Sequence, residues 1–334
     1  MTPAIDPSQV RLFTGSSNPQ LAADIASHLG APLDKTVITR FSNDDLYIQL
    51  CASVRSRAIF IVQSLSPPVN DHLMELLMML DIARSASAKE VHAIIPYFSF
   101  ARSDKKDAPR ISITARLVAD LLQTAGATHV MTMMLHSPQV HGFFSIPTDP
   151  LSSRPVLKRH FEQRDLSGTI VVAPDMGQAR SAARFANDLG LPIAAGNKER
   201  VSDTQVHISG IIGHQVQGFR RALIYDDEIS TGGSVLEMSR LLIEHGIQEL
   251  WVTCTHGVFV REGLERLARV PQITEIVTTD TVHIPIEKRH PKLHVLSVAS
   301  VFGEAIRRNH LRQSIGDLFV FGEEKQTNSP RLSE

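Results

Sequence analysis

Cysteine is scarce in this sequence, and neither sign of charge is in excess. Among 334 residues there are only two cysteines, Cys51 and Cys254. Two cysteines do not make a disulfide framework for a chain of this length, which favours a reducing compartment, the cytoplasm. Lys and Arg total 34 and Asp and Glu total 35, for a net charge of −1. This balance provides no overall basic field for nucleic acid or for a membrane surface, so we expect neither as a partner.

Long apolar runs and familiar ligand-binding spacings are also missing. The apolar runs are shorter than the ~20 residues that span a bilayer, and residues 1–7 have neither the basic nor the apolar part of a signal peptide. The sequence contains no G-x-x-x-x-G-K-[ST] and no G-x-G-x-x-G, so neither a P-loop nor a Rossmann fingerprint is expected. The cysteines and the 15 histidines lack the spacing of a structural zinc site. Any phosphate group must therefore be held by other means.

What the sequence does contain is a regular alternation of strand and helix patterns. The chain is 43% hydrophobic and 21% charged, which is a globular composition, and its length favours two domains. The alternation predicts βαβ units, hence an α/β fold in which mainly parallel sheets are flanked by helices. A seam is expected around residues 148–160, where prolines and serines gather. The expected strands are 58–62, 91–95, 129–135, 169–173, 222–225, 250–254 and 293–296, and the expected helices are 70–87, 113–125 and one after Ser234.

The strongest chemical signal follows the strand expected at 222–225. Asp226 and Asp227 come directly after it, and a Gly-Gly pair precedes Ser234, which has capping-box spacing to Glu237. Ligands of open α/β sheets bind beyond the carboxyl ends of the strands, and glycines let an anion approach the amides of a helix start. Neighbouring carboxylates accept hydrogen bonds from vicinal hydroxyls. The pattern predicts a sugar-phosphate site; the alternative is a surface turn with a solvated acidic patch.

Other strand ends carry weaker signals. Residues 97–107 combine three aromatic residues with three cations, which suits a nucleotide, although an aromatic core plug followed by a solvated loop explains them equally well. Asp175 follows the strand expected at 169–173 and is a candidate for contact with a metal ion or a hydroxyl. Taken alone, His136 is more typical of a structural histidine, and the charged cluster 196–200 of solvated surface.

Taken together, these strand ends resemble the ribose-phosphate pyrophosphokinase family. The resemblance implies two type I phosphoribosyltransferase-like domains: residues 8–152 on the ATP side and residues 153–320 with the ribose 5-phosphate site, followed by a disordered tail at 321–334. The motif at 226–234 is shared with type I phosphoribosyltransferases, and the N-terminal half separates the two families. The resemblance covers about residues 10–320, and its closest stretches are 62–64, 69–77, 95–98 with 101–102, 116–122 and 142–144.

The resemblance also implies a reaction. The diphosphoryl group of ATP passes to the C1 hydroxyl of ribose 5-phosphate, with Mg²⁺ as cofactor and AMP as second product. Family members assemble from dimers into hexamers, and we expect adenine to be bound partly by a neighbouring subunit. The resemblance makes Lys198 and Arg200 catalytic and His136 and Asp175 metal ligands. It assigns ATP to Phe41, Asn43, Asp44, Asp45, Arg102, Ser103, Asp104 and His136, and ribose 5-phosphate to Asp175, Arg200, Asp226, Asp227, Ser230, Thr231, Gly232, Gly233 and Ser234.

The chain departs from the family pattern at several positions. Met134 stands where the family commonly has Asp, which removes a carboxylate near the metal-linked His136. Residues 43–45 read Asn-Asp-Asp rather than Asp-Gly-Glu, Ser230 replaces a usual Asp, and Glu199 interrupts a basic run. Because the catalytic cations and the sugar-phosphate loop remain, we expect an active enzyme that differs in metal or regulatory detail.

Two other functions stay open. A phosphoribosyltransferase would consume phosphoribosyl pyrophosphate instead of making it, but this leaves the Phe41 and Arg102 regions without a role. A non-catalytic regulatory paralogue would be expected to lose the cations Lys198 and Arg200 or the acidic pair Asp226 and Asp227, and the sequence keeps both.

Overall fold

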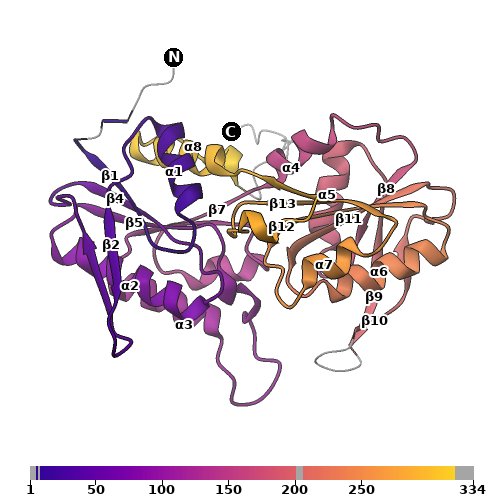
Figure 1. Cartoon of the computed structure of the whole chain (residues 1–334), viewed down its shortest axis with the longest axis horizontal. Helices are drawn as coiled ribbons and strands as arrows, with labels where there is room; N and C mark the ends of the chain where they lie inside the picture. Colours follow the sequence, from indigo (N-terminus) through magenta and orange to yellow (C-terminus); the bar gives the residue numbers. More distant parts are fainter. Residues whose placement is uncertain (1–4, 7, 201–205, 320–334) are drawn as a thin grey trace, which may run out of the picture. The chain divides into compact units, whose positions relative to one another are not determined.

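The chain folds into two compact units, each built around its own sheet (Figure 1). The computed structural model describes residues 5–6, 8–200 and 206–319. Unit 1 is Met1–Gln63, Leu73–Ser152 and Ala299–Glu334, and unit 2 is Ser64–His72 and Ser153–Val298. Among the described residues, no helix is long and apolar enough to cross a membrane.

Unit 1 contains a five-stranded, all-parallel sheet in the order β1-β4-β5-β6-β7. Helices α1 and α8 lie on one face of this sheet, and α2 and α3 lie on the other (Figure 1). A separate antiparallel hairpin, β2-β3, follows α1 in the chain. The elements are β1 (Val10–Thr14), α1 (Pro19–Leu29), β2 (Thr36–Arg40), β3 (Leu46–Leu50), β4 (Ala58–Val62), α2 (Val69–Ser85), β5 (Glu90–Ile95), the 3₁₀ turn η1 (Ser99–Arg102), α3 (Thr114–Ala125), β6 (His129–Met133), η2 (Pro138–Phe143), β7 (Thr148–Leu151), α8 (Ala299–His310) and η4 (Gly316–Leu318).

Helix α1 shows how local sequence sets an element of this unit. Its N-cap Asn18 accepts a hydrogen bond from the Leu21 amide at 3.3 Å, and Pro19 occupies the first turn, where no backbone donor is needed. The helix ends at Gly30, whose φ of 64° is the left-handed conformation that glycine adopts without strain. Its last turn packs so closely on α8 that a side chain at Gly303 would collide with His28.

Unit 2 contains a seven-stranded sheet in the order β10-β9-β8-β11-β12-β13-β14, parallel except for the β10-β9 pair. The strand order therefore reverses between β8 and β11. The elements are α4 (Arg154–Phe161), β8 (Thr169–Ala173), α5 (Ala179–Leu189), β9 (Ile193–Arg200), β10 (Val206–Gly213), β11 (Arg221–Ile229), α6 (Gly233–Glu244), β12 (Glu249–Gly257), α7 (Gly263–Ala268), β13 (Ile273–Thr279), η3 (Ile286–Lys288) and β14 (Leu293–Leu296).

Both faces of this second sheet are buried. Alternate residues of β11 enter two different clusters: Ile224 packs with α6 and α7, whereas Leu223 and Tyr225 pack with α4 and α5. Burial on both faces explains why the central strands appear as continuous apolar runs rather than as alternating patterns. The α/β fold class predicted from the sequence is thereby confirmed.

The predicted strands 58–62, 169–173 and 293–296 are found with the same bounds. The strand predicted at 222–225 is longer and runs through the acidic residues to Ile229. The chain from Ala299 onwards belongs to unit 1 by its contacts. The bounds 8–152 and 153–320 therefore stay a prediction of which part of the chain binds which substrate. The tail predicted at 321–334 lies outside the described residues.

Candidate active site

The reversal of strand order in unit 2 marks a place where a ligand can bind. In open α/β sheets, ligands bind beyond the carboxyl ends of the strands at such a reversal, which here lies between β8 and β11. Asp175 follows β8 by two residues, and residues 230–232 connect β11 to α6. The structure thus brings two of the predicted signals to one edge of one sheet.

The carboxylates at this edge are crowded. Asp226 and Asp227 lie within β11, and the Asp227 amide donates to Asp226 Oδ1 at 2.9 Å. Burial raises the pKa of the Asp226 carboxyl well above its usual range, and the negative charges of Asp227 and Asp175 raise it further. Asp175 is thus near enough to contribute to the raised pKa of Asp226, while the roles of the three residues stay predictions. Cations or hydroxyl donors placed here would be favoured.

The loop from Ser230 to Gly233 has the form of an anion cradle. Gly232 is the N-cap of α6 with φ 75°, and a Cβ there would lie 3.2 Å from Leu267 Cγ, so no larger residue fits without strain. The carbonyl oxygens of residues 229 and 230 accept hydrogen bonds from residues 258–260, and that of Thr231 accepts one from Arg266. The 12-residue helix α6 begins directly after this loop, and the start of a helix is a favourable place for an anion.

The capping box predicted around Ser234 is wrong. Ser234 is the second residue of α6 rather than its N-cap, because the left-handed Gly232, two residues earlier, is the N-cap. Glu237 pairs instead with Arg240, with 2.8 Å between Oε1 and Nη2. The supporting contacts from Gly263 and Arg266 were also missed, because no local motif connects α7 to the loop that it supports.

Lys198 and Arg200 lie on the last residues of β9. Beyond Ala195, β9 pairs only with the antiparallel β10, in which Lys198 is opposite Ile208 and Arg200 is opposite Val206. The side chains of Lys198 and Arg200 lie outside the described part of the structure.

The predicted adenine loop forms the tip of the β2-β3 hairpin. Phe41 is 51% exposed, and its ring lies 6.1 Å from that of Tyr47. The side-chain oxygens of Asn43 and Asp45 accept backbone amides of the turn at 3.3 and 2.9 Å, and Asp44 pairs with Arg40 at 2.7 Å. Two of the predicted acceptors therefore organise the turn, while the aromatic face of Phe41 stays open to solvent.

A second group of predicted ATP residues follows β5 and β6. Ser137 Oγ donates to Asp104 Oδ2 at 2.6 Å, which joins the two strand-end loops. Ser103 accepts from the Thr114 amide at 3.1 Å and so supports the start of α3, while Arg102 and His136 are exposed. The neighbouring Tyr97 and Phe98 are buried, which favours the core-plug interpretation of these two aromatic residues.

Met134, which follows β6, is buried and has a φ of 44°. The left-handed conformation is unusual for a side chain of this size, whereas Asp and Asn adopt it more readily. The backbone at this position thus suits the carboxylate that the sequence lacks.

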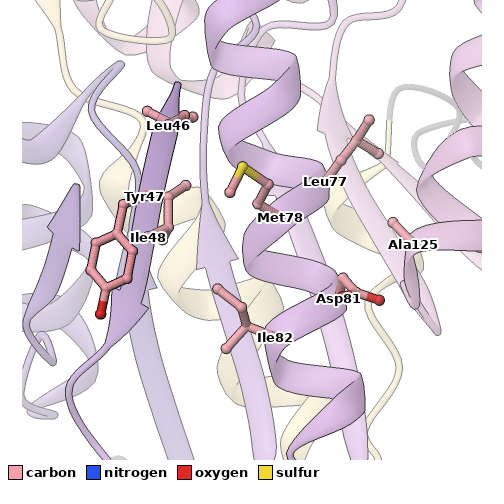
Figure 2. Close-up of a pocket in the computed structure, with 8 residues that line it drawn as sticks. All are labelled: Leu46, Tyr47, Ile48, Leu77, Met78, Asp81, Ile82 and Ala125. Atoms are coloured by element: carbon pink, nitrogen blue, oxygen red, sulfur yellow. The ribbon is translucent and has the colours of Figure 1, made fainter. Parts of the chain in front are cut away.

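An apolar groove separates the hairpin from α2 and was not foreseen. Figure 2 shows Met78 and Ile82 of α2 on the side of the helix toward β3, with Ile48 on the near side of that strand and the Tyr47 ring on its far side. The pocket that these residues line has a volume of about 430 Å³. The methionines of α2 differ in their surroundings: Met79 is fully buried, whereas Met74 is 52% exposed. Burial in the core therefore explains the apolar residue Met79 of this helix but not the exposed Met74.

Comparison with known proteins identifies the family. A model of the N-terminal domain of ribose phosphate pyrophosphokinase matches residues 10–126, and a phosphoribosyl synthetase-associated domain matches residues 209–320. A protein of Streptomyces coelicolor is 49% identical over 310 residues, which is 93% of this chain and 97% of that protein. A ribose-phosphate pyrophosphokinase of Deinococcus radiodurans is 45% identical, covering 94% of this chain and 98% of its own length. The chain belongs to the ribose-phosphate pyrophosphokinase family.

The structure agrees with this membership. The crystal structure of phosphoribosylpyrophosphate synthetase from Mycobacterium smegmatis matches with a TM-score of 0.85 at 35% identity, covering 91% of this chain and 99% of that one. The family, the enzyme class and the function of a ribose-phosphate pyrophosphokinase predicted from the sequence are thereby confirmed. The roles of individual residues stay predictions.

Proposed function

We propose that this member of the family transfers the diphosphoryl group of ATP to ribose 5-phosphate through the sites described above. The C1 hydroxyl oxygen attacks the β-phosphorus, and the bond from that phosphorus to the oxygen bridging it to the α-phosphorus breaks. AMP leaves with the bonding electron pair, and the hydroxyl proton is released. The observation that carries the proposal is the anion cradle before α6 beside the crowded carboxylates at the strand reversal.

Unit 2 carries the residues proposed to bind ribose 5-phosphate. The first amides of α6, with Ser230, Thr231, Gly232, Gly233 and Ser234, hold the 5-phosphate, which the positive end of the helix favours. Asp226 and Asp227 accept hydrogen bonds from the ribose hydroxyls. A phosphate group and a diol bound in this way fix the sugar at both ends and so orient its C1 hydroxyl, which is the main task of a phosphoryl-transfer enzyme.

Unit 1 carries the residues proposed to bind ATP. Phe41 offers an exposed face for stacking of adenine, and Arg102 and His136 are exposed at strand ends where they can meet phosphates. Asn43 retains acceptor capacity for the adenine amino group, because a carbonyl oxygen that already accepts one amide has a second lone pair. Asp104 and Ser103 act chiefly by fixing the loops that carry these residues.

Mg²⁺ is the cofactor that fits these residues. The described residues contain no cluster of three or more His, Cys, Asp or Glu side chains arranged to hold a metal ion. Mg²⁺ is commonly bound by one or two carboxylates plus substrate phosphates, and Asp175 in the crowded acidic group provides a hard oxygen donor of this kind. When bound, Mg²⁺ neutralises charge on the phosphate oxygens. His136 is proposed as its contact on the ATP side.

Lys198 and Arg200 are proposed to act on the transferred group. Both residues stand on the part of β9 that pairs with the antiparallel strand β10. Positive charge aimed at the oxygens that gain negative charge in the transition state lowers the barrier without any covalent step. Closure of such a segment also excludes water, which would otherwise accept the diphosphoryl group.

The complete site is proposed to be shared between subunits of a dimer-based oligomer, with hexamer as the expected size. Phe41 lies on a hairpin that forms no sheet with the rest of unit 1, and its ring is exposed. These features suit a residue that contributes to the site of a neighbouring subunit.

The rivals are less well supported. A phosphoribosyltransferase does not need the ATP-side domain, whose family model matches residues 10–126. A non-catalytic paralogue does not need the acidic pair and the glycine cradle, which are both present.

The reaction is tested by incubating the protein with ATP, Mg²⁺ and ribose 5-phosphate and following the products by ³¹P NMR. We expect AMP and phosphoribosyl pyrophosphate to appear in equal amounts. Formation of ADP would indicate simple phosphoryl transfer, and no turnover with intact substrate binding would support the regulatory paralogue.

A further inference from the structure

A second pocket in unit 1 lies at the opposite edge of the sheet from the residues described above. It has a volume of about 710 Å³ and opens at the amino ends of β4, β5 and β6, whose first residues are Ala58, Glu90 and His129. The end of α8 and the residues after it close the other side, from Asn309 to Arg312. All of its lining residues belong to unit 1.

His92 lines this pocket and is the feature that indicates a ligand. Its side chain is buried, with 3% exposure, and neither Nδ1 nor Nε2 has a hydrogen-bond partner among the described residues. The closest carboxylate oxygen, on Glu90, lies 3.4 Å from Nε2. A neutral imidazole carries one donor and one acceptor, so two buried polar atoms lack the partners that such atoms normally have.

The surrounding groups in the described part of the chain pack against the His92 ring but form no hydrogen bond with its nitrogen atoms. Its ring stacks on Phe60 at 4.3 Å and lies 5.3 Å from the ring of His129. His129 is itself fully engaged, through Nε2 with Asp149 at 2.6 Å and through Nδ1 with Asn309 at 3.1 Å. Burial, together with His129 and His310, lowers the pKa of His92 to about 3, so its ring is neutral near pH 7.

The charged groups on the pocket rim favour an anion. Lys89 and Arg312 are both exposed and form no ion pair within the described residues, and Glu90 is the only carboxylate of the lining. We propose that this pocket binds a small organic anion, whose carboxylate or phosphate group lies between Lys89 and Arg312 while a polar group of the ligand reaches His92. The ligand would be distinct from the two substrates, which occupy the carboxyl ends of the strands.

Calorimetric titration of the full chain tests this proposal with two probes, succinate and inorganic phosphate. Saturating ribose 5-phosphate is present so that the proposed phosphate cradle is occupied. We expect saturable binding of at least one probe, weakened about tenfold or more in Lys89→Met because a charge-assisted contact is lost. Binding should be unchanged in Lys288→Met, which removes an exposed lysine of unit 2. Succinate binding alone identifies a carboxylate ligand, and phosphate binding alone a phosphate ligand.

A second variant keeps the test decisive. His92→Phe preserves the stack on Phe60 but removes both polar atoms, and it should also weaken binding. The proposal is overturned if neither probe binds saturably, or if Lys89→Met binds as the unchanged chain does. It is equally overturned if Lys89→Met weakens binding and His92→Phe does not, because the anion would then lie on the rim rather than in the pocket.

Discussion

At the scale of single residues, the most specific prediction concerns Lys198 of β9. Lys198→Ala should lower the turnover number on the order of 10²-fold or more, because it removes a positive charge aimed at the transferred group. The affinity for ribose 5-phosphate should change little, since that substrate is proposed to bind at α6. Steady-state kinetics together with direct titration of ribose 5-phosphate separates the two effects. Lys288→Ala is the matched control, and near-normal turnover of Lys198→Ala would remove this residue from the mechanism.

Met134 allows a test of the metal site. Met134→Asp should lower the concentration of Mg²⁺ that gives half-maximal activity at saturating ATP, because it restores a hard oxygen donor near His136. The buried left-handed backbone suits Asn as well as Asp. Met134→Asn is therefore a control for relief of backbone strain without a new charge. If both variants behave alike, or if Asp raises the Mg²⁺ requirement, the residue is a packing residue and His136 becomes a phosphate contact.

His92 makes a prediction about pH and stability. Burial, His129 and His310 lower its pKa to about 3 in the folded chain, below the ordinary value of 6.5. The unfolded chain therefore binds more protons, so the free energy of unfolding should decrease as pH falls below about 6.5, by on the order of 2 kcal/mol at pH 4.5.

His92→Phe should remove this part of the pH dependence. Denaturant unfolding between pH 4.5 and 7.5 measures it, with the exposed His214→Phe as control. Equal slopes in all three proteins would contradict the assignment.

At the scale of elements, the turn into α6 combines two requirements for glycine. Gly232 has a φ of 75° and a Cβ there would crowd Leu267, whereas Gly246 has a φ of 94° with no atom within 4 Å of a Cβ. Both Gly→Ala changes cost backbone strain of about 1 kcal/mol or more. Only Gly232→Ala should also raise the KM for ribose 5-phosphate. A similar rise in Gly246→Ala would show that general destabilisation, not the cradle, is responsible.

The same turn shows what sequence could and could not predict. Buried strands such as β8 were predicted with the right bounds, because apolar runs on both faces of a parallel sheet leave a strong local pattern. The predicted bounds of β11 were too short, because acidic residues within a strand are typical of the start of a loop. The helix start was shifted to Ser234 because capping patterns do not reveal a left-handed glycine. The contacts of α7 under the cradle are long-range and have no local signal.

The site was predictable to a similar extent. Asp175 and Asp226 lie at neighbouring strands because β8 and β11 are adjacent where the strand order reverses, which is where ligands of such sheets bind. The strand order itself appears only in the structure. The structural duties of Asn43 and Ser103 were not predictable, because a polar residue looks the same whether it contacts a ligand or its own backbone.

At the scale of the whole molecule, sharing of the active site between subunits predicts complementation. Phe41→Ala and Lys198→Ala should each be poorly active. Co-expressed mixed oligomers should exceed the sum of the two, because some sites combine an intact Phe41 from one subunit with an intact Lys198 from another. Activity of the purified mixture is compared with that of the separate variants. Mixed oligomers no more active than their components, or full activity in a verified monomer, would rule the shared site out.

The central claim concerns which bond of ATP is broken, and ATP labelled with ³²P at the β-phosphorus tests it most directly. After reaction with ribose 5-phosphate and Mg²⁺, the products are separated by chromatography. Transfer of the diphosphoryl group predicts that the label moves quantitatively into phosphoribosyl pyrophosphate and that AMP is unlabelled. Label recovered in ADP, or label that remains entirely in ATP, would contradict it.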